Sequence, residues 1–146
     1  MANEVKIEYH TDELEKVFEE KVDKALALCG LECEGDAKIE IESHPRRVDT
    51  GRLRNSITWA TKKERSFVQP TSKNKDASSA DGIQPSQAEE RAVVIGTNVE
   101  YAARIHEGDA TTGLDPNRFL RNAVERNANK YKQIIDDTLR GALTSG

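Results

Sequence analysis

A chain of 146 residues suits one domain with a modest core, and 5% aromatic residues is few for a subunit that buries its apolar surface unaided. Its net charge of −4 argues against a protein that simply coats DNA. We expect no secretory leader, because residues 1–10 are polar, and no membrane span, because no apolar run approaches the roughly 20 residues that a span needs.

Charge is distributed unevenly along the chain. Residues 11–43 hold 11 acidic and 4 basic side chains, residues 44–91 hold 10 basic and 6 acidic ones, and residues 117–146 hold 6 basic and 3 acidic ones. Surfaces of opposite charge on one small subunit suit head-to-tail association between copies. The alternative is that these charges belong to solvated helix faces and a basic loop, and the charge pattern alone does not separate the two.

The first two elements are an arm and a long helix. Residues 3–9 alternate apolar and charged side chains, which predicts a short strand or an arm, residues 1–10, that pairs with a partner. From a cap at Thr11 or Asp12, apolar residues recur in steps of three and four, which predicts a helix with one buried stripe. The expected stripe is Leu14, Val17, Phe18, Val22, Ala25, Leu28, Cys29 and Cys33.

The end of this helix is ambiguous in the sequence. Gly30 and Gly35 each weaken a helix, and residues 38–42 also alternate like a strand. We favour a continuous helix to about Ser43, because Cys33, Ala37 and Ile41 extend the stripe in steps of four. The two cysteines, Cys29 and Cys33, are too few for a zinc site, and we interpret them as reduced core residues of a cytosolic product.

The middle of the chain predicts a small antiparallel sheet. After a turn, a single helical turn surrounds Leu53, and residues 56–61 read as a strand with Ile57 and Trp59 on one face. Residues 62–91 contain few large apolar side chains and predict a long, flexible polar loop. Residues 92–95 then return as the antiparallel partner strand.

The C-terminal third predicts two helices. Tyr101, Ala102 and Ile105 fit one face of a short helix within residues 99–107. A last helix is expected to start near Pro116, with Asp115 as its cap, and to run for nearly eight turns. Residues 1–146 are therefore expected to form one α+β domain, in which two long amphipathic helices pack on a small antiparallel β-sheet and a long polar loop projects.

No set of residues forms a convincing catalytic or metal site. His10, His44 and His106 are scattered in polar stretches, where a solvated histidine is the ordinary case. His106, Glu107 and Asp109 superficially resemble a metal or acid–base cluster, but adjacent helical residues point in different directions. We therefore expect no catalytic residue, no metal, no cofactor and no enzymatic activity.

One compact basic cluster comprises Arg46, Arg47, Arg52 and Arg54. These side chains are candidates for contact with a neighbouring subunit, for contact with phosphates, or for ion pairs with Asp49 and the glutamate-rich first helix of the same chain. The sequence leaves these three possibilities open.

Two blocks resemble a known family. The first block is Val48-Asp49-Thr50-Gly51-Arg52-Leu53-Arg54-Asn55-Ser56-Ile57, and the second runs from Val94-Ile95-Gly96-Thr97-Asn98-Val99-Glu100-Tyr101-Ala102 to Pro116-Asn117-Arg118-Phe119-Leu120. Their order after an amphipathic helix resembles the neck, or tail-completion, proteins of long-tailed bacteriophages and prophages. The resemblance covers roughly residues 14–61 and 92–140.

The resemblance implies structural roles for the motif residues. Asp49, Thr50 and Gly51 would form a turn after the first helix, and six apolar residues would lock the helices onto the sheet: Leu53, Ile57, Tyr101, Ala102, Phe119 and Leu120. It implies a virion protein of the head-to-tail joint, assembled in the host cytoplasm as a ring of, we expect, six copies. Its expected partners are the head-closure or connector protein and the tail terminator or tail-tube protein, with DNA passing through the channel at most. The alternative is a phage accessory protein that binds nucleic acid through Arg46–Arg54.

Overall fold

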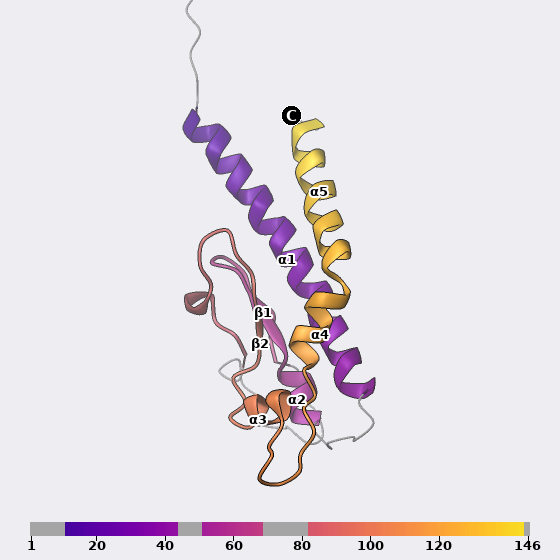
Figure 1. Cartoon of the computed structure of the whole chain (residues 1–146). Coiled ribbons are helices and arrows are strands. Elements are labelled where there is room, and N and C mark those ends of the chain that lie inside the picture. The colour runs from indigo at the N-terminus through magenta and orange to yellow at the C-terminus, as the bar shows by residue number, and fades with distance from the viewer. Residues whose placement is uncertain (1–10, 44–50, 69–81, 145–146) are drawn as a thin grey trace, which may run out of the picture.

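The computed structural model describes residues 11–43, 51–68 and 82–144, and it confirms the α+β class (Figure 1). The predicted arm, residues 1–10, lies outside the described residues. In chain order the elements are α1 (Thr11–Ser43), α2 (Gly51–Ser56), β1 (Thr58–Ala60), the short 3-10 helix η2 (Pro85–Gln87), β2 (Val94–Gly96), α3 (Ala102–Glu107), α4 (Phe119–Arg126) and α5 (Ala128–Thr144).

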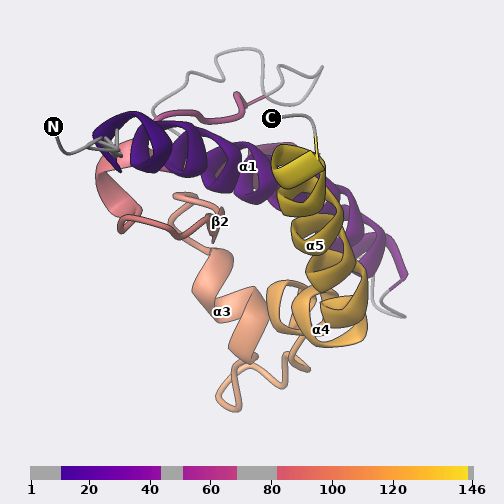
Figure 2. The same ribbon diagram turned by 90° about the horizontal axis from the view of Figure 1, so that it is seen from above.

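Helix α1 is the element on which the others pack. It is continuous over 33 residues, so the predicted end at Ser43 is confirmed. Helix α5 runs antiparallel beside it, and the β1–β2 hairpin lies along a neighbouring side of α1 (Figures 1 and 2). The buried residues of α1 that face these elements follow one another in steps of four, and all but the last have small side chains: Ala25, Cys29, Cys33, Ala37 and Ile41. Small side chains let the neighbouring backbones approach closely.

The hydrophobic core lies at the lower half of α1. Cys33, Ala37 and Ile41 of α1 pack there with residues of α2, α3 and α4. The fully buried members are Leu53, Ile57, Phe119 and Ala123. Both cysteines are buried as free thiols, and burial raises the pKa of each.

The sheet is a single antiparallel pair, as expected, with Trp59 opposite Ile95. All three residues of β1 are buried, so both faces of the strand are covered. The buried threonines in and just after β1 are hydrogen-bonded: Thr58 Oγ1 accepts a bond from the Ile83 backbone N–H at 2.7 Å, and Thr61 Oγ1 accepts one from the Glu64 N–H at 3.0 Å. These bonds offset the cost of removing hydroxyl groups from water.

The described flanks of the predicted loop 62–91 lie against the domain. Val68, Ile83 and Ala88 are buried, although the surrounding sequence is polar. Residues 69–81 lie outside the described residues. The flanks therefore add a third segment beside β1, and Ala60 forms an isolated antiparallel bridge with Arg65.

The C-terminal helix differs from the prediction at two places. It begins at Phe119 and not near Pro116, because the Asn117 backbone N–H donates to the carbonyl of Ile105 in α3 and keeps the preceding segment extended. It is also interrupted at Asn127, where the side-chain amide donates to the Ala123 carbonyl at 2.9 Å. That side-chain bond occupies an acceptor of the last turn of α4 and competes with a continuous helix.

Contact with Trp59 explains why glycine, a poor helix former, is tolerated at position 30 of α1. A Cβ atom at this position would lie 2.8 Å from two ring atoms of Trp59, so the indole rests directly on the glycine backbone. At Gly35, in contrast, an added Cβ would meet nothing within 4 Å. The first glycine sets the distance between α1 and the sheet, whereas the second has no such role.

We predict opposite effects for the two alanine substitutions. Gly30→Ala should lower the free energy of unfolding by about 1–3 kcal/mol, because the indole must move, although alanine is the better helix former. Gly35→Ala should raise it by up to about 1 kcal/mol. Urea denaturation followed by far-UV circular dichroism measures both, and equal effects at the two sites would contradict the packing role of Gly30.

Candidate functional site: the uncovered face of α1

The first turns of α1 are largely uncovered in the described part of the chain, apart from an ion pair between Glu19 and Arg91. All residues from 13 to 20 except Glu19 are exposed, and we call this segment the α1 tip. Leu14, Val17 and Phe18 are 66%, 51% and 46% exposed, and their spacing places them on one side of the helix. The expectation that these residues and Leu28 belong to the buried stripe was therefore wrong.

The exposed apolar positions continue beyond the tip. Leu14, Val17, Leu28 and Leu31 fall on one line along α1, in which Lys21 and Lys24 occupy the intermediate steps of three and four residues. This line spans 18 residues, or about 25 Å of helix. Helix α1 thus carries two apolar faces, one in the core and one in solvent, and the exposed one has the spacing of a helix that packs along a partner.

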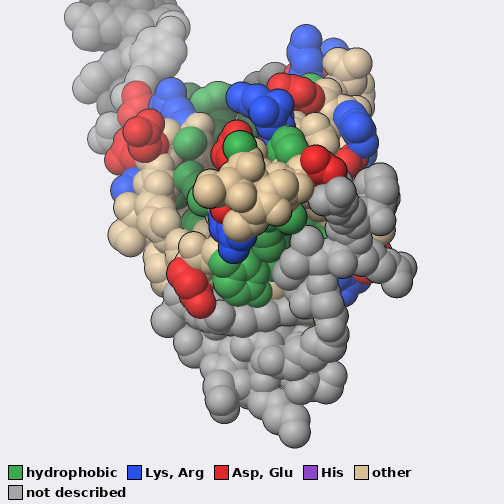
Figure 3. All heavy atoms as spheres, turned by 60° about the horizontal axis from the view of Figure 1, so that its bottom comes forward, with side chains coloured by type: hydrophobic (Ala, Val, Ile, Leu, Met, Phe, Trp, Pro, Cys, Tyr) green, Lys and Arg blue, Asp and Glu red, His purple; other side chains and the backbone are tan. Residues whose placement is uncertain are grey.

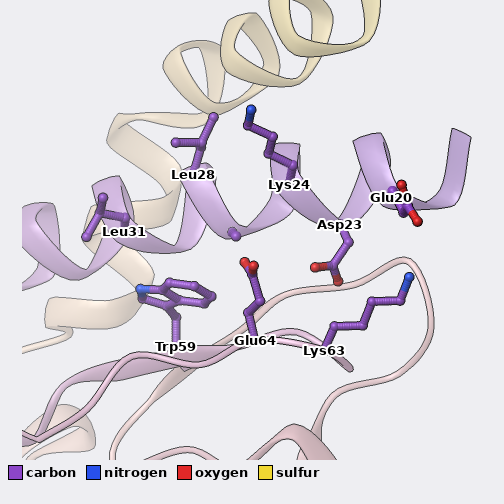
Figure 4. Close-up of a pocket in the computed structure, with 9 residues that line it drawn as sticks. Glu20, Asp23, Lys24, Leu28, Leu31, Trp59, Lys63 and Glu64 are labelled. Carbon is purple, nitrogen blue, oxygen red and sulfur yellow. The ribbon is translucent and has the colours of Figure 1, made fainter. Parts of the chain in front are cut away.

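A groove runs between α1 and the segment after β1 (Figure 4). Its volume is about 520 Å³, and Leu28, Leu31 and Trp59 supply its apolar lining. Its rim is charged on both sides, with Asp23 reaching from α1 and Lys63 and Glu64 from the opposite segment (Figure 4). We call it the Trp59 groove. The indole is 8% exposed, and its Nε1–H has no hydrogen-bond partner within the described part of the chain.

A second hollow, of about 390 Å³, lies between β2, α3 and α4. Its apolar lining includes Ile95, Ala103, Phe119 and Leu120, and we call it the α3–α4 hollow. On the lower face of the molecule, apolar side chains reach the surface among basic and acidic ones (Figure 3). A shallow apolar hollow with charged neighbours has the character of a protein contact surface.

His106 belongs to this hollow and is not a solvated histidine. Its side chain is 17% exposed, its Nδ1 lies 2.8 Å from Glu107 Oε1, and its ring packs edge-on against Phe119 at 5.2 Å. Adjacent residues of α3 therefore do meet, contrary to the expectation from helix geometry. The hydrogen bond from His106 holds the pKa of Glu107 below its usual value.

Asp109 does not join this pair. Its carboxylate accepts bonds from the Thr111 backbone N–H and from Arg104 Nε, both at 2.9 Å. The hydrogen bonds from Thr111 and then from Arg104 lower the pKa of Asp109 to about 2. Within the described residues no three histidine, cysteine, aspartate or glutamate side chains converge as a metal site.

The residues singled out in the sequence fall into three groups. Asp49, Thr50, Arg46 and Arg47 lie outside the described residues, as does the side chain of Arg52, and Gly51 is the first residue of α2. Arg54 Nε lies 2.5 Å from Glu42 of α1. The six apolar motif residues lie in one cluster, where Leu53, Ile57, Ala102 and Phe119 are buried and Tyr101 and Leu120 are partly buried against them.

The uncovered face of α1 was not recognised in the sequence, although its signal was present. Both apolar lines of α1 advance in steps of three and four, so their residues merge into one apparent stripe. The two lines can be told apart by their heptad positions. The line from Leu14 to Leu31 includes Lys21 and Lys24. Lysine in the middle of an apolar line indicates a face that meets solvent or a partner and not a buried core.

Trp59 gives a direct test of how the groove is built. Trp59→Phe should change the free energy of unfolding by less than about 1.5 kcal/mol, because the ring stays and an unpaired N–H is removed. Trp59→Ala should lower it by roughly 3–5 kcal/mol. Circular dichroism during urea denaturation measures both, and a phenylalanine variant as unstable as the alanine variant would show that the indole N–H has a partner.

Among the described residues no helix is long and apolar enough to cross a bilayer. Comparisons with protein-family models, with curated proteins and with solved structures gave no match to this chain. The likeness to phage neck proteins therefore stays a prediction from the sequence blocks.

Proposed function

We propose that this chain is a structural virion protein of the head-to-tail joint of a long-tailed phage, and that it assembles as a ring. The observation that carries the proposal is the α1 tip, which presents Leu14, Val17 and Phe18 without a cover in the described part of the chain. The Asp49–Ile57 and Val94–Leu120 blocks supply the setting, because their order resembles the neck and tail-completion family.

The uncovered side chains favour association but only weakly. Burying one large aliphatic or aromatic side chain contributes about 1.5–3 kcal/mol, and these three are already half covered by their own helix. Association costs at least several kcal/mol in lost translational and rotational freedom. We therefore expect free subunits to associate weakly and a complete ring to form beside neighbouring virion proteins, which suppresses premature polymerisation.

The charges of the domain support a protein contact more than a nucleic-acid contact. Four basic side chains of the described part that lie outside α1 are held by its carboxylates: Arg54 by Glu42, Arg91 by Glu19, Arg126 by Glu40 and Lys130 by Asp36. Cations that already have partners are less available to phosphates. The rival reading as a nucleic-acid-binding accessory protein predicts strong DNA affinity that falls steeply with salt, which we do not expect.

The first test is the native mass of the full chain. Multi-angle light scattering across concentrations, alone and with the head-closure and tail-tube proteins of the same phage, should show a discrete ring or a subunit that becomes a ring when a neighbour is added. A monomer at every concentration that ignores those proteins would remove the proposal, and salt-dependent DNA binding would then put the rival first.

A tip variant tests whether the uncovered face drives association. Leu14→Glu with Phe18→Glu should leave the free energy of unfolding within about 0.5 kcal/mol, because both side chains are exposed, yet reduce association at least tenfold. Ile39→Glu is the matched control, since Ile39 is also an exposed apolar residue of α1 but lies near the other end. Equal loss in the control would show that general solubility, and not the tip, decides association.

A further inference from the structure

We propose that the α1 tip of one copy docks in the α3–α4 hollow of the next copy, so that subunits join head to tail. This inference rests on the proposed function and names the contact that builds the ring. It identifies a second copy of the chain as the occupant of both surfaces.

The two surfaces lie at opposite ends of the molecule. Helix α1 is about 50 Å long, and its tip is at the upper end in Figure 1, whereas α3 and the start of α4 are at the lower end. One chain therefore cannot fill its own hollow with its own tip. A surface at one end that fits a surface at the other end gives a heterologous contact, which forms a ring when the rotation closes.

The shapes of the surfaces are complementary. The tip is a helix that projects three apolar side chains at positions i, i+3 and i+4, which is the usual anchor pattern of a helix lying in a groove. The hollow offers an apolar lining from different elements, including Ile95 of β2, Ala103 of α3 and Leu120 of α4. A convex apolar ridge thus faces a concave site with a partly apolar lining, in which Thr97, Asn98 and Glu107 are polar members.

Charge distinguishes this pairing from a contact between two tips. Glu13, Glu15 and Glu20 form no ion pair within the described part of the chain, although most carboxylates lower on α1 are paired. Of the four glutamates in the tip, residues 13–20, Glu19 is paired with Arg91, which leaves three glutamates against Lys16. Two such tips repel each other, whereas a basic site attracts them.

Two arginines lie beside the hollow, whose own lining includes the acidic Glu107. Arg118 and Arg121 flank Phe119 and Leu120 and are 46% and 57% exposed. Each lies 3.9 Å from a carboxylate, Glu107 or Glu125, which is longer than a charge-assisted hydrogen bond. Each guanidinium has five N–H donors, so both arginines retain donors for glutamates of an incoming tip.

Two complementary variants test the contact. The tip variant is Leu14→Glu with Phe18→Glu, and the hollow variant is Arg118→Glu with Arg121→Glu; all four positions are largely exposed, so both variants should fold. Lys132→Glu on the exposed side of α5 is the matched control for charge reversal. Circular dichroism checks folding, and sedimentation velocity of the full chain at high concentration measures association.

The expected result is asymmetric. Each variant alone should stay monomeric, and Lys132→Glu should associate like the unmodified chain. A mixture of the two variants should form a 1:1 dimer and nothing larger, because one intact tip still meets one intact hollow while the other two surfaces carry added glutamates. A dimer of the hollow variant alone would instead indicate contact between two copies of α1 and would overturn the inference.

The failure of this inference is distinguishable from the failure of the proposed function. If the unmodified chain forms a ring and the hollow variant forms the same ring, the joint protein stands but the tip docks elsewhere, on another surface or on another virion protein. If the unmodified chain associates neither with itself nor with the head-closure and tail-tube proteins, both proposals are overturned.

Discussion

The close contact between α1 and its neighbours is the constraint on which the rest of the structure depends. Gly30 lies under the indole of Trp59, and Cys29 and Cys33 face α5, so the sheet and the C-terminal helices approach one long helix without bulky side chains between them. Tyr131 adds a polar clasp, since its hydroxyl donates to Asp36 at 2.7 Å. The same burial and bond raise the pKa of that hydroxyl above its usual value.

Packing everything on two neighbouring sides of α1 has a consequence for the opposite side. A helix of 33 residues is longer than the body that leans on it, and the covering elements reach mainly its middle and C-terminal turns. Leu14, Val17 and Phe18 therefore remain largely exposed. In the monomer they add little to the buried apolar surface, although the chain has few aromatic residues with which to build a core. Exposed apolar residues in line on a helix indicate a contact surface more than a packing failure.

Electrostatics follow the same division. Where α1 is covered, its carboxylates pair with Arg54, Arg126 and Lys130. Acidic side chains of residues 11–43 are thus balanced there by basic side chains of later segments in the same subunit. Where α1 is uncovered, Glu19 pairs with Arg91, whereas Glu13, Glu15 and Glu20 form no ion pair within the described part of the chain. The acidic side chains in the C-terminal half of α1 are therefore mostly paired within the subunit. Most of those at its N-terminal tip face solvent, where a partner could meet them.

The sequence by itself determined the α+β class, the length of α1, the antiparallel pairing around Trp59 and the reduced state of both cysteines as core residues, because these follow from local periodicity and composition. Only the tertiary structure decided which apolar line of α1 is buried, since both lines have the same spacing and the choice depends on where α5 and the sheet pack. It also decided that the last helix starts at Phe119 and breaks at Asn127, because hydrogen bonds from Asn117 to α3 and from the Asn127 side chain outweigh local helix preference. The α3–α4 hollow joins residues from β2 to α4 that are far apart in the chain, so no local pattern could have assembled it.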